Sequence, residues 1–403
     1  MPETQEKTYL VAPEVPGLPS IGGGTWSGFR SGTALVHLVL RLGTIAAALA
    51  NAWPMTGWVQ RVGHKKVAEP RIAEPALSEG GGPDVFSHQL MRKMLLPMVL
   101  AVLAYGALLL YADAGAITRQ AAEVPGKVLV LATNLAVSNY VVRFFRWQYY
   151  LRCLQISVPI YDSALIFVSG FAMSITPGKM GEVIKSMLLK QAYDIPVARS
   201  APIVLAERVT DLGGLLILGG VGLLGIAHGT WSAIASFLMV GVLFALSTSR
   251  ALGTFAINTA TRIGPLSRLK SKLLDVQESL LELNKPSAFA LGVALSVVAW
   301  GVQCVSLSVI ASGFADVNLS LQHGLLAYSA PLLAGTLALI PGGLGVTEGS
   351  MTGALQSLGG AGATPAVAAA ITILCRLTTF WIAIALGFAA LAIWRSRRDQ
   401  GEG

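Results

Sequence analysis

The stretch PGGLGVTE, residues 341–348, interrupts a long apolar segment and decides the fold that we expect. It follows the apolar residues 324–340, which we expect to be broken at Pro331. A related stretch, PGKMGE at residues 177–182, follows the 12 apolar residues 164–175. A helix of 12 residues reaches about 18 Å, whereas the hydrocarbon core of a bilayer is about 30 Å thick. We therefore predict two re-entrant helical hairpins, whose tips contain Pro177, Gly178, Gly181, Pro341, Gly342, Gly343 and Gly345.

The composition is that of a polytopic membrane protein. Of the 403 residues, 54% are hydrophobic and 12% are charged, and the mean hydropathy is +0.64. Soluble domains contain about 25% charged residues, so this composition excludes a soluble enzyme, a nucleic-acid-binding module and a disordered protein. The net charge of +8 comes from basic residues beside apolar segments, and we expect no nucleic-acid partner. The three cysteines are isolated, so we predict no metal, no disulfide framework and no cofactor.

Six apolar segments are long enough to be transmembrane helices: residues 94–111, 127–142, 201–228, 231–248, 287–314 and 366–394. Basic residues precede the first segment, follow the second at Arg143 and Arg146, and follow the last. Residues 286–375 contain no lysine or arginine, so this part of the chain includes the outer face. The sequence thus predicts an all-α, multi-pass protein of the cytoplasmic (inner) membrane, with both ends of its core in the cytoplasm.

The two interrupted segments belong to two similar halves. In the first, Trp147 precedes the hairpin, Glu182 ends its tip, and Arg208 lies in the next span. In the second, Trp300, Glu348 and Arg376 follow in the same order, and the Glu-to-Arg spacing is 26 residues in one half and 28 in the other. Basic residues flank only the first hairpin, which we expect to open inward, while the second opens outward. This pattern predicts an inverted-topology repeat, although ordinary loops at both motifs remain an alternative.

The remaining segments complete the predicted organisation. Residues 1–92 form a largely flexible N-terminal extension, with an amphipathic or apolar helix near 34–53 that either lies at the interface or spans the membrane. Residues 93–398 form the transmembrane domain and 399–403 a tail. Within the domain, repeat one covers about 127–248 and repeat two about 287–394. An amphipathic helix at 265–284 links them on the cytoplasmic surface, buried against the bundle or membrane or used for dimerisation.

Charged residues within the apolar spans are the candidate site. A charge at the centre of a membrane costs about 2.5–3.5 kcal/mol on insertion scales, so each needs a partner or a function. We expect Arg143, Arg146, Lys179, Lys185, Arg208 and Arg376 to bind substrate, because arginine forks and helix N-termini suit phosphate. We expect Glu182, Glu207, Asp211 and Glu348 to couple or gate transport. Two alternatives stay open: an ion-pair network that locks the bundle, and glutamates that only cap helices or pair with arginine. Glu348 and Glu207 are the candidate partners of Arg376.

These motifs resemble those of a known family. The motifs are RxxRW at 143–147, PGxxGE at 177–182, ERxxD at 207–211, PGGxGxxE at 341–348 and Arg376. Together they resemble those of the lysylphosphatidylglycerol synthase transmembrane region, or flippase-like domain family. The resemblance covers roughly residues 93–398. It implies a flippase, which in bifunctional members acts on aminoacylated phosphatidylglycerol; stand-alone relatives are associated with lipid-linked sugars and other lipids. The chain ends at Gly403 without the cytosolic domain that binds aminoacyl-tRNA, so we expect no synthase activity.

The sequence therefore predicts a transporter and not an enzyme. Its substrate would be an anionic or phosphate-bearing membrane lipid, such as an aminoacyl-phospholipid or a polyprenyl-phosphate-linked sugar, moved between leaflets. Its partners would be that lipid, the bilayer and, as an open question, a second copy of the chain. Two alternatives remain: a membrane-embedded enzyme acting on lipid phosphates or lipid-linked sugars, and a non-transporting scaffold. The enzyme would need a nucleophile or metal-binding carboxylates, and no DDxxD motif or histidine accompanies the arginines.

Overall fold

The computed structural model describes residues 99, 103–107, 110–111, 113–175, 182–262, 270–283 and 285–401. The chain divides into two units, Met1–Lys66 and Val67–Gly403, and every described residue belongs to the second. The predicted extension 1–92, its helix near 34–53, most of the predicted span 94–111 and the end of the tail 399–403 lie outside the described residues. So do the hairpin residues Pro177, Gly178, Lys179 and Gly181.

The described residues are helical or connect helices, and no strand occurs among them. The first half contains α3 (Ala114–Ala122), α4 (Gly126–Cys153), α5 (Ile160–Ser169), the short helix η2 (Gly170–Met173), α6 (Ile184–Tyr193), α7 (Val197–Leu223) and α8 (Thr230–Thr248). The second contains α9 (Arg250–Ala260), α10 (Lys270–Leu283), α11 (Pro286–Ala311), α12 (Leu321–Leu337), η5 (Pro341–Gly343), α13 (Val346–Leu358), α14 (Pro365–Arg376), η6 (Leu377–Trp381) and α15 (Ile382–Gly401).

Four helical segments of the described chain are long and apolar enough to cross a membrane. They are Gly126–Cys153, Thr230–Thr248, Pro286–Ala311 and Pro365–Arg397, the last of which joins α14, η6 and α15. Helix α7 is also long, with 27 residues, but it carries three charged residues within two turns. The fold is therefore that of an all-helical, multi-pass membrane protein, as the sequence predicts.

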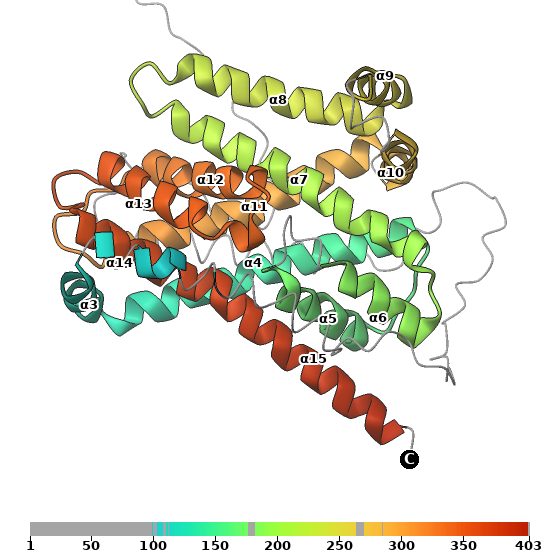
Figure 1. The fold of residues 1–403 in the computed structure, drawn as a ribbon, viewed down its shortest axis with the longest axis horizontal. Helices are drawn as coiled ribbons and strands as arrows, with labels where there is room; N and C mark the ends of the chain where they lie inside the picture. The colour runs from blue at the N-terminus through green and yellow to red at the C-terminus, as the bar shows by residue number, and fades with distance from the viewer. Residues whose placement is uncertain are drawn as a thin grey trace, which may run out of the picture. The chain divides into compact units, whose positions relative to one another are not determined.

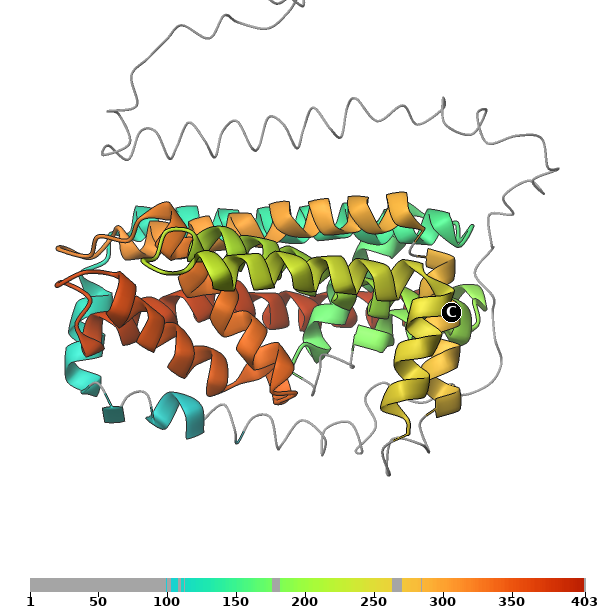
Figure 2. The ribbon, with the colours of Figure 1, turned by 90° about the horizontal axis from the view of Figure 1, so that it is seen from above.

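The long helices α4, α7 and α11 pack side by side and position the candidate site (Figure 1). Two shorter helical units lie toward opposite ends of these helices. The unit α5, η2 and α6 lies toward one end, and α12, η5 and α13 lie toward the other, in both views (Figures 1 and 2). Helix α12 packs against α13, so the second unit is a helical hairpin with its bend at η5.

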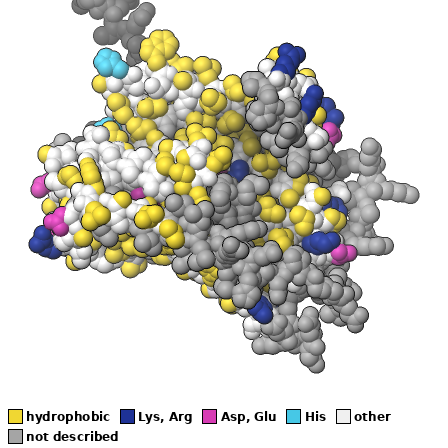
Figure 3. Space-filling view, in the orientation of Figure 1, with side chains coloured by type: hydrophobic (Ala, Val, Ile, Leu, Met, Phe, Trp, Pro, Cys, Tyr) yellow, Lys and Arg dark blue, Asp and Glu magenta, His cyan; other side chains and the backbone are white. Residues whose placement is uncertain are grey.

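The surface of the described chain carries large apolar side chains. On α8, Trp231 is 80% exposed and Leu238 is 66% exposed. Figure 3 shows hydrophobic side chains over this face, while lysine and arginine side chains gather mainly where α9 and α10 lie. Exposed large apolar side chains of this kind fit contact with lipid.

Several predicted boundaries are wrong in instructive ways. Helix α12 runs through Pro331, and the chain breaks only after Leu337, where Leu339 has φ 54° and Gly342 has φ 63°. A buried proline costs one helix hydrogen bond, which neighbouring groups in a packed bundle offset. The predicted span 127–142 continues as α4 to Cys153, because the arginines expected to end it point into the protein. The short helices α3 and α9 were not predicted, and α10 represents only the described part of the predicted helix 265–284.

Glycine lets α7 approach α11 closely at the level of the candidate site. A Cβ atom at Gly214 would lie 2.7 Å from the Cβ of Ser296 and 3.1 Å from the backbone nitrogen of Val297. We expect Gly214→Ala to destabilise the protein by about 1–3 kcal/mol, because α11 must move away from α7. Thermal unfolding in detergent measures this. Gly241→Ala on α8 is the control, since a Cβ there meets nothing within 4 Å; equal stability of the two variants would contradict the close packing.

Candidate functional site

Seven charged side chains from α4, α7 and the beginning of α6 form one buried group, which we name the Arg208 group. Its members are Arg143, Arg146, Lys185, Arg208, Glu182, Glu207 and Asp211. The Arg208 side chain is 16% exposed, and each of the other six is 8% exposed or less. Four cations face three acids, so the group carries one surplus positive charge. Because buried unpaired charges cost several kcal/mol each, the mutual pairing is what allows these residues between apolar helices.

Glu182 lies at the centre of the Arg208 group, two residues before α6 begins. Its Oε2 atom is 2.5 Å from Arg208 Nη2 and 3.7 Å from Lys185 Nζ. Its Oε1 atom is 3.9 Å from Arg143 Nη2. One carboxylate thus faces three cations on three helices, with its shortest contact to Arg208.

Asp211 on α7 joins α4 and α11. Its Oδ1 atom accepts hydrogen bonds from Arg146 Nη1 at 2.7 Å, Trp300 Nε1 at 3.0 Å and Ser296 Oγ at 3.1 Å. Arg146 also donates to Thr210 Oγ1 at 3.2 Å and contacts Ser296 Oγ. Charge-assisted hydrogen bonds of this kind are about twice as strong as neutral ones, so this carboxylate holds three long helices together.

Aromatic rings hold the remaining two cations. Lys185 Nζ is 2.6 Å from Glu207 Oε2 and lies 4.6 Å from the centroid of the Trp147 ring. The Arg143 guanidinium lies between Phe171 and Trp300, 5.3 Å and 5.6 Å from the two ring centroids. A cation over an aromatic face is attracted to it even without an acid, so Arg143 is held in place independently of Glu182.

The arginines of this group keep hydrogen-bond donors without a partner among the described residues. These donors are Arg143 Nε, Arg146 Nε and Nη2, and Arg208 Nε, all shielded from solvent. Two acceptors, Glu207 Oε1 and Asp211 Oδ2, are also unsatisfied. A buried donor without a partner costs about 1–3 kcal/mol, so an acceptor-rich ligand here would gain binding energy.

A second buried ion pair, Arg376 with Glu348, lies at the bend of the second hairpin. Arg376 Nε is 2.7 Å from Glu348 Oε1, and Arg376 Nη2 donates to the carbonyl of Gly342 at 3.1 Å. The other carboxylate oxygen of Glu348 accepts the N–H of Gly345 at 2.7 Å. Glu348 therefore both caps α13 and pairs with arginine. The sequence offered Glu348 and Glu207 as candidate partners of Arg376. In the structure Arg376 pairs with Glu348, while Glu207 pairs with Lys185.

The bend beside this pair requires glycine. Gly342, Gly343 and Gly345 have φ of 63°, 67° and 84°, a left-handed backbone that other residues rarely adopt. A Cβ at Gly343 would also lie 2.6 Å from Thr347 Oγ1. The backbone can therefore turn sharply and expose its carbonyl to Arg376.

The two Glu–Arg pairs have similar spacings in the sequence. Glu182 pairs with Arg208, and Glu348 pairs with Arg376, at the spacings of 26 and 28 residues. Sequence reasoning missed the residues of α11 that hydrogen-bond to the Arg208 group, of which Ser296 is the clearest example. Ser296 and Trp300 lie four residues apart on one helix face, and that spacing is the signal that could have found them.

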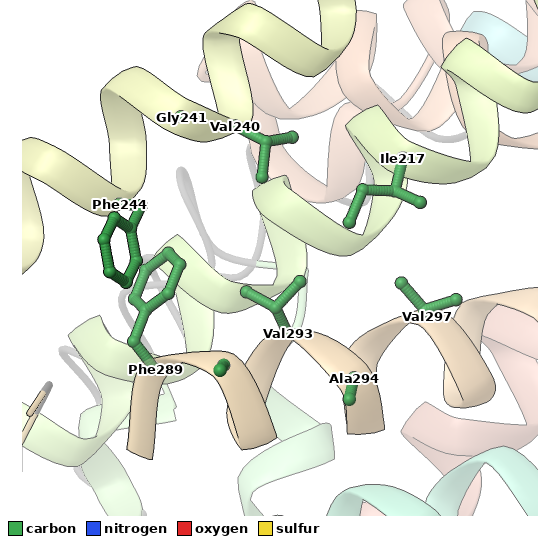
Figure 4. Close-up of a pocket in the computed structure, with 9 residues that line it drawn as sticks. Ile217, Val240, Gly241, Phe244, Phe289, Val293, Ala294 and Val297 are labelled. Carbon is green, nitrogen blue, oxygen red and sulfur yellow. The ribbon is translucent and has the colours of Figure 1, made fainter. Parts of the chain in front are cut away.

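An open apolar groove of about 580 Å³ lies on the surface of the long helices. It is formed by α7, α8 and α11, and its lining residues are Ile217, Val240, Gly241, Phe244, Phe289, Ala290, Val293, Ala294 and Val297. Figure 4 shows Phe244 and Phe289 together at one end, with ring centroids 5.4 Å apart. Val293 and Val297, which line the groove, lie on either side of Ser296 along α11, and Ser296 donates a hydrogen bond to Asp211 of the Arg208 group.

Comparison with known proteins identifies relatives along most of the chain. A family model described as the lysylphosphatidylglycerol synthase TM region matches residues 98–387. A UPF0104 membrane protein of Methanothermobacter thermautotrophicus is 24% identical over 324 residues, which are 74% of this chain and 95% of the relative. A UPF0104 membrane protein of Methanocaldococcus jannaschii is 23% identical over 68% of this chain and 87% of its own length. One of Pyrococcus horikoshii is 24% identical over 65% and 85%.

Proposed function

Because this chain belongs to the lysylphosphatidylglycerol synthase TM region family, we propose that it transports a membrane lipid with an anionic or phosphate-bearing head group between leaflets. The proposal is transport without catalysis, in the cytoplasmic (inner) membrane, with both ends of the core in the cytoplasm. An aminoacyl-phospholipid and a polyprenyl-phosphate-linked sugar both have the required chemistry. The Arg208 group would receive the head group, and the lipid chains would stay in the bilayer.

The observation that carries the proposal is the surplus positive charge of the Arg208 group. A structural ion-pair network would balance its charges, whereas this group has four cations for three acids. Its arginines also keep buried donors that have no partner in the described part of the chain, and arginine binds two phosphate oxygens at once. A phosphate would supply both the missing negative charge and the missing acceptors. Ionisable residues of this kind within membrane helices mark substrate pathways.

We also propose that the two halves are inverted repeats with re-entrant hairpins. A long helix, two shorter helices and a second long helix follow one another as α4, α5, α6 and α7, and again as α11, α12, α13 and the segment Pro365–Arg397 that begins with α14. The short units lie toward opposite ends of the long helices, which supports opposite orientations (Figures 1 and 2). In transporters with such repeats, the substrate site lies where the interrupted helices meet, and one repeat rocks against the other. The matching Glu–Arg pairs would then mark that site from both sides.

The groove between α8 and α11 would hold a lipid chain. Its lining is apolar throughout, it is continuous with the exposed apolar surface of α8, and Val293 and Val297 bring it next to Ser296 of the charged site. An aliphatic chain buried there would gain about 0.8 kcal/mol per methylene transferred from water, and shape complementarity would favour one chain over bulk lipid. The groove and the Arg208 group together would accommodate an amphipathic molecule.

Filling the groove is expected to slow lipid transport. Gly241→Phe adds a ring to the groove lining, and its Cβ atom would meet nothing within 4 Å, so the protein should fold normally. We expect a loss of about tenfold in the transport rate, equivalent to about 1.4 kcal/mol of lost chain binding. The matched control is Met239→Phe on the same helix, since Met239 is 51% exposed and does not line the groove. Dye-labelled phosphatidylglycerol in proteoliposomes reports both rates, and equal rates for the two variants would refute a chain-binding groove.

Lipids that copurify with the protein test the proposed substrate class. Native mass spectrometry of wild-type protein released from detergent should detect bound anionic lipids. The same measurement on Arg208→Gln should show them reduced at least tenfold, while Arg250→Gln, whose side chain is 69% exposed, should retain them. Copurification of neutral lipids alone, or equal retention by both variants, would argue against a phosphate-binding site.

A further inference from the structure

Glu182 faces the cations that a phosphate would need. Its carboxylate lies 2.5 Å from Arg208 and 3.9 Å from Arg143, and each of these arginines has a buried Nε donor to which no described residue offers an acceptor. The other two acids of the group have their shortest ion-pair contacts with other cations. Glu207 lies 2.6 Å from Lys185, and Asp211 lies 2.7 Å from Arg146. Glu182 is therefore the acid nearest to both Arg143 and Arg208.

From this geometry we infer that Glu182 is a built-in competitor for the substrate head group at Arg143 and Arg208. This inference rests on the proposed function and adds a regulatory residue to the same site. A phosphate that enters displaces the Glu182 carboxylate from the Arg208 guanidinium and takes over its hydrogen bonds. A carboxylate has one charge and two oxygens in one plane. A phosphodiester has the same charge but a tetrahedral set of oxygens, and a monoester has up to two charges, so either phosphate can also reach the Nε donors that lack a partner among the described residues.

The surroundings of the two arginines suit such an exchange. Arg208 is the most accessible member of the group, at 16% exposure, so a ligand reaches it first. Arg143 stays in place when Glu182 leaves, because the rings of Phe171 and Trp300 hold its guanidinium. Glu182 itself retains a contact with Lys185, three residues along the chain, at 3.7 Å. The displaced acid therefore keeps a counter-charge and is not left alone in an apolar interior.

The exchange also explains how a head group can be released. If Glu182 occupies the arginines nine-tenths of the time in the free protein, the affinity for phosphate is lowered about tenfold. A site with a surplus charge and several free donors would otherwise bind phosphate too tightly for rapid turnover. Because Glu182 lies two residues before α6, its movement also displaces the beginning of that helix.

The test measures phosphate binding to purified protein in phosphatidylcholine nanodiscs. The probes are dioctanoyl phosphatidic acid and, in a separate arm, inorganic phosphate, and calorimetry gives Kd. We expect Glu182→Gln to bind phosphatidic acid about tenfold more tightly than wild type, because glutamine competes weakly for arginine. A purely structural Glu182 predicts weaker binding. Glu278→Gln is the matched control: Glu278 also lies 2.5 Å from an arginine, Arg250, but is 66% exposed, and its loss should leave Kd unchanged.

Each outcome decides the inference. Equal or weaker binding by Glu182→Gln overturns it, as does the absence of phosphate binding in every variant. If Glu182→Gln fails to fold, Glu182→Asp is the variant to test. A shorter acid reaches Arg208 less well, so we expect it to bind phosphatidic acid about threefold more tightly than wild type. An unchanged Kd would contradict the inference. If Glu182→Gln binds only phosphatidic acid more tightly, the competing ligand is a lipid phosphate. If it binds both probes more tightly, the site accepts any phosphate. Lipid transport is measured separately, so tighter binding without transport refutes the proposed function and leaves the inference standing.

Discussion

Replacing Arg376 with alanine is expected to destabilise the folded protein by about 3–5 kcal/mol. The substitution leaves the Glu348 carboxylate, whose side chain is 2% exposed, without its counter-charge at 2.7 Å. Removing one partner of a buried ion pair has this cost because the remaining charge has lost its solvation and gained nothing in return. The bend at η5 should loosen as well, since Arg376 also binds the carbonyl of Gly342. Unfolding of detergent-solubilised protein, followed by tryptophan fluorescence, measures the loss.

A double-mutant cycle separates the buried charge from general damage. Glu348→Gln keeps an acceptor for the N–H of Gly345 and removes the charge, so Arg376→Ala combined with Glu348→Gln should recover at least half of the lost stability. Arg397→Ala is the control, because its pair with Asp162 has a similar length of 2.9 Å but Arg397 is 53% exposed. Exposed pairs contribute about 0–1 kcal/mol. A cost below about 1 kcal/mol for Arg376→Ala would contradict a charge held in an apolar interior.

Replacing Arg208 with glutamine is expected to lower the rate of lipid transport about 10- to 100-fold. Each hydrogen bond from a charged donor to phosphate contributes about 1.5–3 kcal/mol, and Arg208 is the most accessible cation of its group. The substitution removes the surplus positive charge, so four cations become three for the three acids. Glu182 keeps its contacts with Lys185 and Arg143, so the fold should survive.

Two variants control this prediction. Arg250→Gln removes an equally charged residue whose pair with Glu278 is exposed, and transport should be unchanged. Arg208→Lys retains the charge but not the planar fork, so partial transport is expected. Wild-type rates in Arg208→Gln, with the protein folded and inserted, would remove this residue from the substrate pathway.

The family and the all-helical membrane character could be predicted from the sequence. The motif around PGGLGVTE and the low content of charged residues pointed to both, and the family match confirms the resemblance. The similar spacings of 26 and 28 residues showed a recurring glutamate and arginine in the two halves, but pairing of each hairpin glutamate with an arginine was only one of the alternatives that the sequence left open. A repeated spacing is informative because it fixes two residues relative to the same element in each half.

The surroundings of the site could not be predicted in the same way. Arg143 and Arg146 follow an apolar run and resemble cytoplasmic anchors, yet they are 7% and 1% exposed. Only tertiary packing decides whether such an arginine faces lipid head groups or a neighbouring helix. Ser296 is likewise an ordinary small residue in an apolar span until α7 and α11 meet at Gly214. The path of α12 through Pro331 depends on packing too, since local chemistry favours a break there.

The most direct test of the central claim follows a lipid across the membrane. Proteoliposomes contain wild-type protein and a trace of phosphatidylglycerol with a dye on one acyl chain, and a membrane-impermeant reductant bleaches the outer leaflet. With transport between leaflets, bleaching should exceed half and approach completion in vesicles that contain protein, and it should stop near half in protein-free vesicles. A dye-labelled glucosyl lipid without phosphate should stop near half in both. Bleaching that stops near half for phosphatidylglycerol, or equal transport of the phosphate-free lipid, would contradict a transporter that recognises phosphate-bearing lipids.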